Sequence, residues 1–170
     1  MRVIRFALAL LLAAVSTAVV LRVAVPRWEC NREKGRINRE VRRMWRTGDE
    51  YERIRRARAN VAACRACLTQ FPQDHQMHML LASNLRILGE RDEALRTLQH
   101  AISLVERPDM WAQIGELEIE RGQIDAGRAA LMTAASFDIY FIDWVSEPMR
   151  HELENAVMER YNRLRASAKK

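Results

Sequence analysis

The amino-acid sequence predicts an all-α protein. Its 170 residues include only 6 Gly and 4 Pro, and aromatic residues make up 6% of the chain. Ala, Leu, Arg and Glu, which favour helices, dominate instead. This composition disfavours β-sandwiches and barrels, which need many turns and many β-branched or aromatic residues. The 3 Cys cannot all pair within one chain, so a disulfide scaffold is excluded.

The N-terminal segment has the composition of a membrane-targeting sequence. After a short basic start, residues 6–21 are apolar apart from two hydroxyl residues. Arg22 interrupts the run, but if its side chain snorkels, residues 3–25 are long enough to cross a bilayer as a helix. A secretory signal cleaved near residues 16–18 is the alternative. We therefore predict a membrane anchor or signal segment over 1–26, in a single-pass membrane protein.

The next segment, 27–49, is a basic neck. Residues 1–65 carry a net charge of +10, and the rest of the chain carries −4. We expect the cations of this neck to meet an anionic membrane surface, and a solvated helix face is the alternative. These cations are Arg27, Arg32, Lys34, Arg36, Arg39, Arg42 and Arg43. No nucleic-acid-reading motif accompanies them, so a nucleic-acid partner is not expected.

The orientation signals of the N-terminal region conflict. The positive-inside rule places the basic neck, and the body that follows it, in the cytoplasm. The basic start followed by an apolar run is typical of a bacterial export signal, which places the body outside. We expect an extracytoplasmic, periplasmic body.

A 33-residue repeat occupies the middle of the chain. Gly89 and Gly122 each follow an apolar-periodic stretch and precede an Asp, which indicates a helix end followed by a helix start. The other matched positions are small or apolar, as close helix crossings require. They pair Leu81-Ala82 with Ile114-Gly115, Ala94 with Gly127, Leu98 with Leu131, and Ala101 with Ala134. Each unit is therefore predicted to be an antiparallel helix pair.

This pattern resembles the tetratricopeptide repeat (TPR) family. Residues 77–104 and 110–137 carry the resemblance, with Trp111 at its expected site and Gly127 in place of the usual Ala. A weaker unit precedes them, with a second helix that ends at Phe71-Pro72. The resemblance implies a solenoid of helical hairpins over 50–146.

A capping helix and basic tail are expected over 147–170. The segment opens with Ser146, Glu147 and Pro148, which together are typical of a helix N-terminus. The aromatic loop 137–146 should lie beneath this helix, with an exposed partner patch as the alternative. Helices are predicted near 3–25, 32–47, 50–71, 75–88, 91–105, 109–121, 124–136 and 147–166.

The TPR resemblance also implies a binding groove, lined by the first helix of each unit. In the family, this groove binds extended peptides or partner helices. The groove residues of this chain are both polar and apolar, which favours a helix or an extended segment as the ligand. Only Arg86 offers a basic donor, so a clamp for C-terminal carboxylates is not expected. The groove positions are Gln76, Met79, Ser83, Arg86, Ile87, Ala112, Glu116 and Ile119.

Candidate chemistry is sparse. Cys64 and Cys67 form a CxxC pair inside a predicted helix, where core packing is favoured over redox or metal chemistry. A cluster at a helix start could bind copper, although a solvated helix start is favoured; it consists of His75, Met77, His78 and Met79. No catalytic motif is present, so we predict a protein that is not an enzyme, with no cofactor and no metal site.

The predicted function is that of a membrane-tethered TPR-like scaffold or adaptor. It would bind a protein partner, as a helix or extended peptide, in the assembly of an envelope or membrane complex. Self-association is plausible with so few repeats. The alternatives are an envelope metal-binding or thiol protein, and a sensor of anionic lipid surfaces that uses the basic neck.

Overall fold

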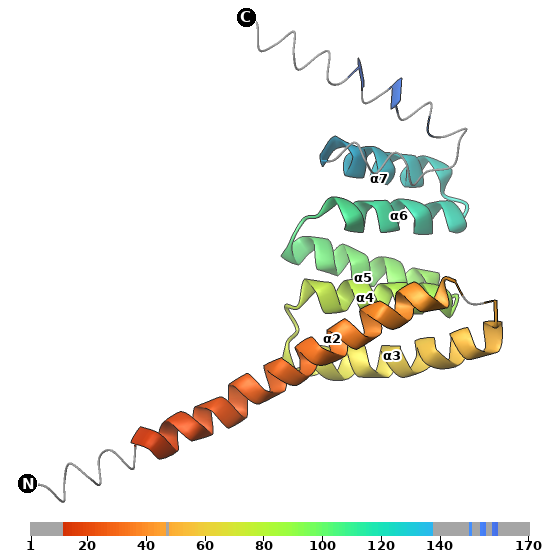
Figure 1. Cartoon of the computed structure of the whole chain (residues 1–170). Helices are drawn as coiled ribbons and strands as arrows, with labels where there is room; N and C mark the ends of the chain where they lie inside the picture. Colours follow the sequence, from red (N-terminus) through yellow and green to blue (C-terminus); the bar gives the residue numbers. More distant parts are fainter. Residues whose placement is uncertain (1–11, 47, 138–149, 151–153, 156–157, 160–170) are drawn as a thin grey trace, which may run out of the picture. The chain divides into compact units, whose positions relative to one another are not determined.

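The computed structural model describes residues 12–46, 48–137, 150, 154–155 and 158–159 (Figure 1). All regular elements in these ranges are helices, which confirms the all-α prediction. The chain divides into two compact units, residues 1–46 and 47–170. The expected capping helix and the aromatic loop before it fall almost entirely outside the described residues.

The first unit is one continuous helical stretch. Residues 12–19 are α-helical and run through a π-helical turn, η1 (Val20–Ala24), into α2 (Val25–Met44). Pro26 lies in the first turn of α2, where a missing backbone N–H is tolerated. Farther along, Arg36 bridges Glu33 and Glu40 at 2.7 and 2.8 Å, one turn away on either side. Such pairs support an exposed helix by a few tenths of a kcal/mol each, about 0.2–0.5 kcal/mol.

The predicted single-pass membrane localisation is wrong. Among the residues that the structure describes, no helix is both long and apolar enough to cross a membrane. The physical reason is that Arg22 follows closely after Leu12, the first described residue, and charged residues recur from Arg27 onward. A spanning helix needs about 20 predominantly apolar residues. Residues 3–11 of the expected segment lie outside the described range.

The second unit contains five described helices in a row. They are α3 (Glu50–Gln70), α4 (His75–Ile87), α5 (Arg91–Leu104), α6 (Pro108–Glu120) and α7 (Ile124–Phe137). Each helix packs against the next one along the chain, as Figure 1 shows. Such sequential packing is the arrangement of a helical-repeat solenoid. The helix pairs α4–α5 and α6–α7 coincide with the two repeats read from the sequence.

The two repeats turn at equivalent glycines. Gly89 and Gly122 have φ of 79° and 80°, a left-handed conformation that glycine adopts without a steric cost. The N–H of Glu90 donates to the carbonyl of Leu85 at 2.9 Å, and that of Gln123 donates to Glu118 at 2.8 Å. These bonds satisfy carbonyls that a helix end would otherwise leave unpaired. The predicted stop signal is therefore a Schellman turn in both repeats.

The contact between α6 and α7 depends on two glycines that have no room for a side chain. A Cβ on Gly115 would lie 2.6 Å from Cγ of Leu131, and one on Gly127 would lie 2.5 Å from Cγ1 of Ile119. The preceding repeat has Ala82 and the equally small Ala94 at these sites, both buried. At Gly127 the usual Ala would also place its Cβ 2.8 Å from the carbonyl oxygen of Gly115, so this site requires Gly.

Candidate interaction surface

The first helices of the two repeats, α4 and α6, are joined by polar contacts. Arg86 on α4 pairs with both Glu116 and Glu120 on α6, and its Nε donates to Oε1 of Glu120 at 2.9 Å. One turn earlier, Ser83 Oγ donates to Oε1 of Gln113 at 3.2 Å. Both contacts hold α4 and α6 next to each other. Together the two helices present one surface, which we call the α4–α6 face.

Arg86 is the central cation of the α4–α6 face. Burial by itself would lower the pKa of Arg86, but the hydrogen bond to Glu120 and the charge of Glu116 outweigh it and raise that pKa. The guanidinium therefore stays charged and already binds two carboxylates. A ligand carboxylate would have to compete with both of them, which argues further against a carboxylate clamp.

The acidic residues of α6 are matched by arginines. Between Pro108 and Glu120 the helix carries acids and no Lys or Arg. Arg107, just before α6, pairs with Asp109 at 2.9 Å, and Arg121, just after it, pairs with Glu118 at 2.6 Å. With Glu116 and Glu120 held by Arg86, the charges of this helix are balanced locally. This surface therefore has little net charge by which a partner could recognise it.

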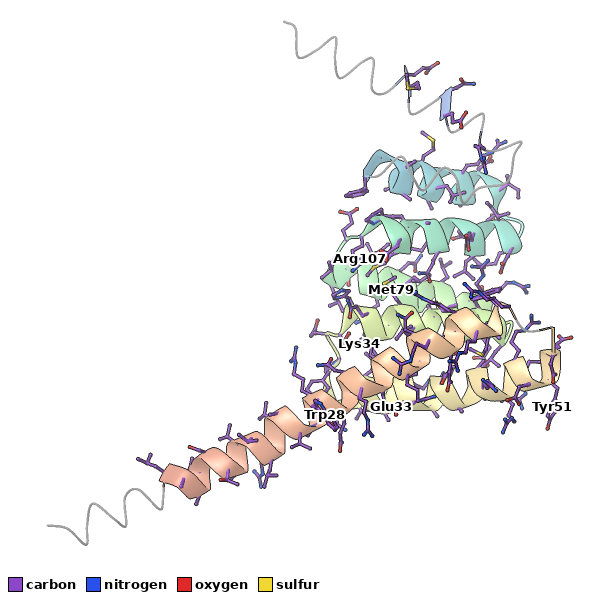
Figure 2. The ribbon with its side chains drawn as sticks, in the orientation of Figure 1. Trp28, Glu33, Lys34, Tyr51, Met79 and Arg107 are labelled. Atoms are coloured by element: carbon purple, nitrogen blue, oxygen red, sulfur yellow. The ribbon has the colours of Figure 1, made fainter. Side chains whose placement is uncertain are left out.

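The structure distributes the eight predicted groove residues over two environments. Ser83, Arg86 and Glu116 contribute to the α4–α6 face through the contacts above. Gln76 is exposed at the start of α4, and Met79 and Ile87 are half-buried on the same helix; Figure 2 labels Met79 on α4.

Ala112 and Ile119, by contrast, pack toward α7. Ala112 is buried in a cluster with Leu131, Ala134 and Ala135, and Ile119 packs against that cluster. These two residues therefore belong to the core of the second repeat. Their spacing of two helical turns places them on one side of α6.

Two polar residues of this surface, Gln113 and Glu120, were not predicted from the sequence, and neither was their neighbour Arg91 at the start of α5. Arg91 Nε lies 3.4 Å from Oε2 of Glu120. The 33-residue repeat offset did contain a signal for the Arg86 bridge. It aligns Arg86 with Ile119, and Glu116 and Glu120 lie close to Ile119 on the same helix. An arginine facing two acids in the next repeat is a pattern that can be sought in sequence.

The seven cations of the basic neck all lie on α2. Arg36 is engaged by Glu33 and Glu40, and the guanidinium of Arg32 lies over the ring of Trp28, 5.1 Å from its centroid (Figure 2 labels Trp28). Arg27, Arg32, Arg39, Arg42 and Arg43 are exposed, and Lys34 and Arg36 are half-buried. Contact of this neck with a membrane surface stays a prediction.

Half of the six candidate metal and thiol residues are buried. Met77 is buried, which removes it from the candidate copper cluster, and Cys64 and Cys67 of α3 are buried, as core packing requires. In the described ranges no three His, Cys, Asp or Glu side chains are grouped as metal ligands. His78 has an unforeseen neighbour instead: the ring of His100 on α5, at 4.7 Å between centroids.

Comparison with known proteins supports the fold. No family model matches the chain, and no curated protein matches it either. Among solved structures, the chain is similar to a thermophilic TPR protein from Thermus thermophilus, with a TM-score of 0.63 and 19% sequence identity. The match covers 84% of this chain and 69% of the other one. The chain therefore has a TPR-like fold, as the repeat pattern predicted.

Proposed function

We propose that the protein is a TPR-like scaffold that binds a protein partner through the α4–α6 face. The observation that carries the proposal is the bridge from Arg86 to Glu116 and Glu120, which joins the first helices of both repeats into one surface. On α4, the apolar side chains of Met79 and Ile87 are also partly exposed. TPR-like folds generally mediate protein–protein interaction, which supports this function over catalysis.

The partner chemistry that fits this face is an amphipathic helix or an extended peptide. The charges of the α4–α6 face are already paired with one another, so a purely ionic ligand would have to break existing ion pairs. An amphipathic segment can instead cover Met79 and Ile87 with apolar side chains and use Gln76 or Gln113 for hydrogen bonds. A larger assembly would supply such a segment, and a second copy of the chain is the other source.

A site-specific photo-crosslinker at Met79 would test this proposal in the full-length chain. The matched control carries the same crosslinker at Arg96, an exposed residue of α5. We expect a protein adduct from position 79 and none from position 96. The captured segment, made as a synthetic peptide, should bind the purified chain, and Ile87→Glu should weaken that binding at least tenfold.

Two results would contradict the proposed function. One is equal capture from both positions, which would indicate nonspecific contact. The other is peptide affinity unchanged by Ile87→Glu while Arg96→Glu weakens it, which would assign binding to another face. An adduct with the mass of a dimer would identify self-association as the interaction.

A further inference from the structure

Two histidine rings meet across the first hairpin. His78 comes from the first turn of α4 and His100 from the last part of α5, and their ring centroids are 4.7 Å apart with an interplanar angle of 81°. His78 is half-buried and His100 is exposed. The pair is therefore accessible to small solutes from one side. The scaffold function described above makes no use of it.

The hydrogen bonding of His78 defines which ring nitrogen is available. Its Nε2 lies 2.9 Å from the carbonyl oxygen of Pro72. A carbonyl can only accept, so Nε2 carries the proton and donates, and in the neutral ring Nδ1 keeps its lone pair. Burial lowers the pKa of His78, as does the neighbouring His100, while the Pro72 carbonyl and Asp74 oppose this. The neutral ring is thus favoured near neutral pH.

This arrangement is the one that metal-binding histidines use. Such histidines almost always donate their second ring N–H to a carbonyl or carboxylate, which fixes the ring and makes the other nitrogen more basic. Metal–nitrogen bonds of about 2.0–2.1 Å place the centroids of two rings on one ion roughly 4.5–5.2 Å apart. The observed 4.7 Å falls inside this range. A rotation of the exposed His100 ring about its side-chain bonds, with His78 held by Pro72, would turn the edge-to-face contact into shared ligation.

We propose that His78 and His100 together bind one divalent transition-metal ion of the class that prefers imidazole, such as Ni²⁺ or Zn²⁺. His78 binds through Nδ1, and water completes the coordination. No third protein ligand is expected in the described ranges: Met77 is buried, and Asp74 accepts from the N–H of Met77 at 3.0 Å as the N-cap of α4. With two protein ligands, the ion binds reversibly and with modest affinity.

Metal binding at this pair would link α4 to α5. An ion that binds the folded hairpin and not the unfolded chain stabilises the folded state in proportion to the logarithm of its concentration. Because imidazole must be neutral to bind, the affinity should fall as the pH is lowered and protons compete with the metal for the ring nitrogens. The site would thus make the first repeat sensitive to metal concentration.

The test uses the full chain, purified without a polyhistidine tag, stripped with chelator and titrated with NiCl₂ in a calorimeter at pH 7.5. We expect one ion per chain that is lost on re-addition of chelator, and a thermal midpoint that rises with Ni²⁺. His100→Asn, at an exposed position, should weaken binding at least tenfold without altering the helical circular dichroism. His78→Asn should do the same.

The other two histidines of the chain supply matched controls, His75→Asn and His151→Asn. Both should bind Ni²⁺ like the wild type. No binding to the wild type, affinity unchanged in His100→Asn, or an equal loss in either control would each overturn the proposal. An affinity that does not change between pH 7.5 and 5.5 would overturn it as well, because imidazole ligands must release their protons.

Discussion

Asn60 of α3 and Asn84 of α4 are hydrogen-bonded to each other inside the core, with Nδ2 of Asn60 3.2 Å from Oδ1 of Asn84. Neither residue is accessible to solvent, and Asn84 also donates to the carbonyl of Leu80 at 2.7 Å. The next repeat has Leu117, equally buried, at the position of Asn84. A buried polar pair is directional where an apolar contact is not, so this bond specifies how α3 packs on α4.

Replacing one member of this pair should cost more than replacing both. Asn84→Leu removes the oxygen that accepts from Asn60, and we expect a loss of about 1–3 kcal/mol in the free energy of unfolding. The double variant Asn60→Ala/Asn84→Leu removes both amides and should recover part of that loss. Chemical denaturation of the wild type, both single variants and the double variant gives the coupling energy. Strictly additive losses would show that the two residues act independently.

The glycine contact between α6 and α7 predicts a steric penalty. Gly115→Ala would place a methyl group 2.6 Å from Leu131 Cγ and 3.0 Å from the carbonyl oxygen of Gly127. We expect the free energy of unfolding to fall by about 1–3 kcal/mol, because backbone atoms cannot move aside. Gly35→Ala is the matched control, since its new methyl group meets only the end of the Arg39 side chain, at 3.5 Å. That change should be neutral or stabilising, because alanine favours helix.

The bridge between the two repeats predicts an unequal effect of two arginine substitutions. Arg86→Met leaves Glu116 and Glu120 without their shared cation, and since only 18% of the Arg86 side chain is exposed, we expect a loss of roughly 1–2 kcal/mol. Arg55→Met removes a cation that is 66% exposed and should change stability much less. Thermal unfolding of both variants at low and high salt makes the comparison. Equal losses would mean that the bridge has no special role in stability.

The lowered pKa of His78 predicts a pH-dependent stability. In the unfolded chain the imidazole takes up a proton near its ordinary pKa of 6.5. In the folded chain burial disfavours the protonated ring, and this effect outweighs the Pro72 carbonyl and Asp74, which favour it. The unfolded state therefore binds more protons as the pH falls through 6.5, so stability should decrease there. His78→Asn should reduce this slope in denaturation curves measured with chelator between about pH 7.5 and 5. An unchanged slope would assign the effect to other groups.

The membrane prediction went wrong for a reason that lies in the chain itself. It depended on counting residues 3–25 as one apolar segment despite Arg22, and no helix in the described part of the chain satisfies the requirement for length and hydropathy together.

The groove prediction rested on family geometry alone. Helix periodicity does not say whether a residue such as Ala112 faces its own hairpin partner or the next repeat, and the structure places it against α7.

The sequence by itself determined the helices from α3 to α7, their order and the pairing of the last four into two repeats. It missed the continuity of the first unit, where a break was expected between residues 25 and 32 but residues 12–44 are helical throughout. The features that it determined depend on local causes: caps at Asp49 and Asp74, left-handed turns at Gly89 and Gly122, and small residues at a fixed offset. Only the tertiary structure decided which polar side chains meet, such as Asn60 with Asn84 and Arg86 with Glu120. These partners lie 24 and 34 positions apart, and their contact depends on how far each helix is rotated and shifted against its neighbour. That packing is a collective property of the folded core, and the repeat offset brings candidate partners close without deciding which side chains meet.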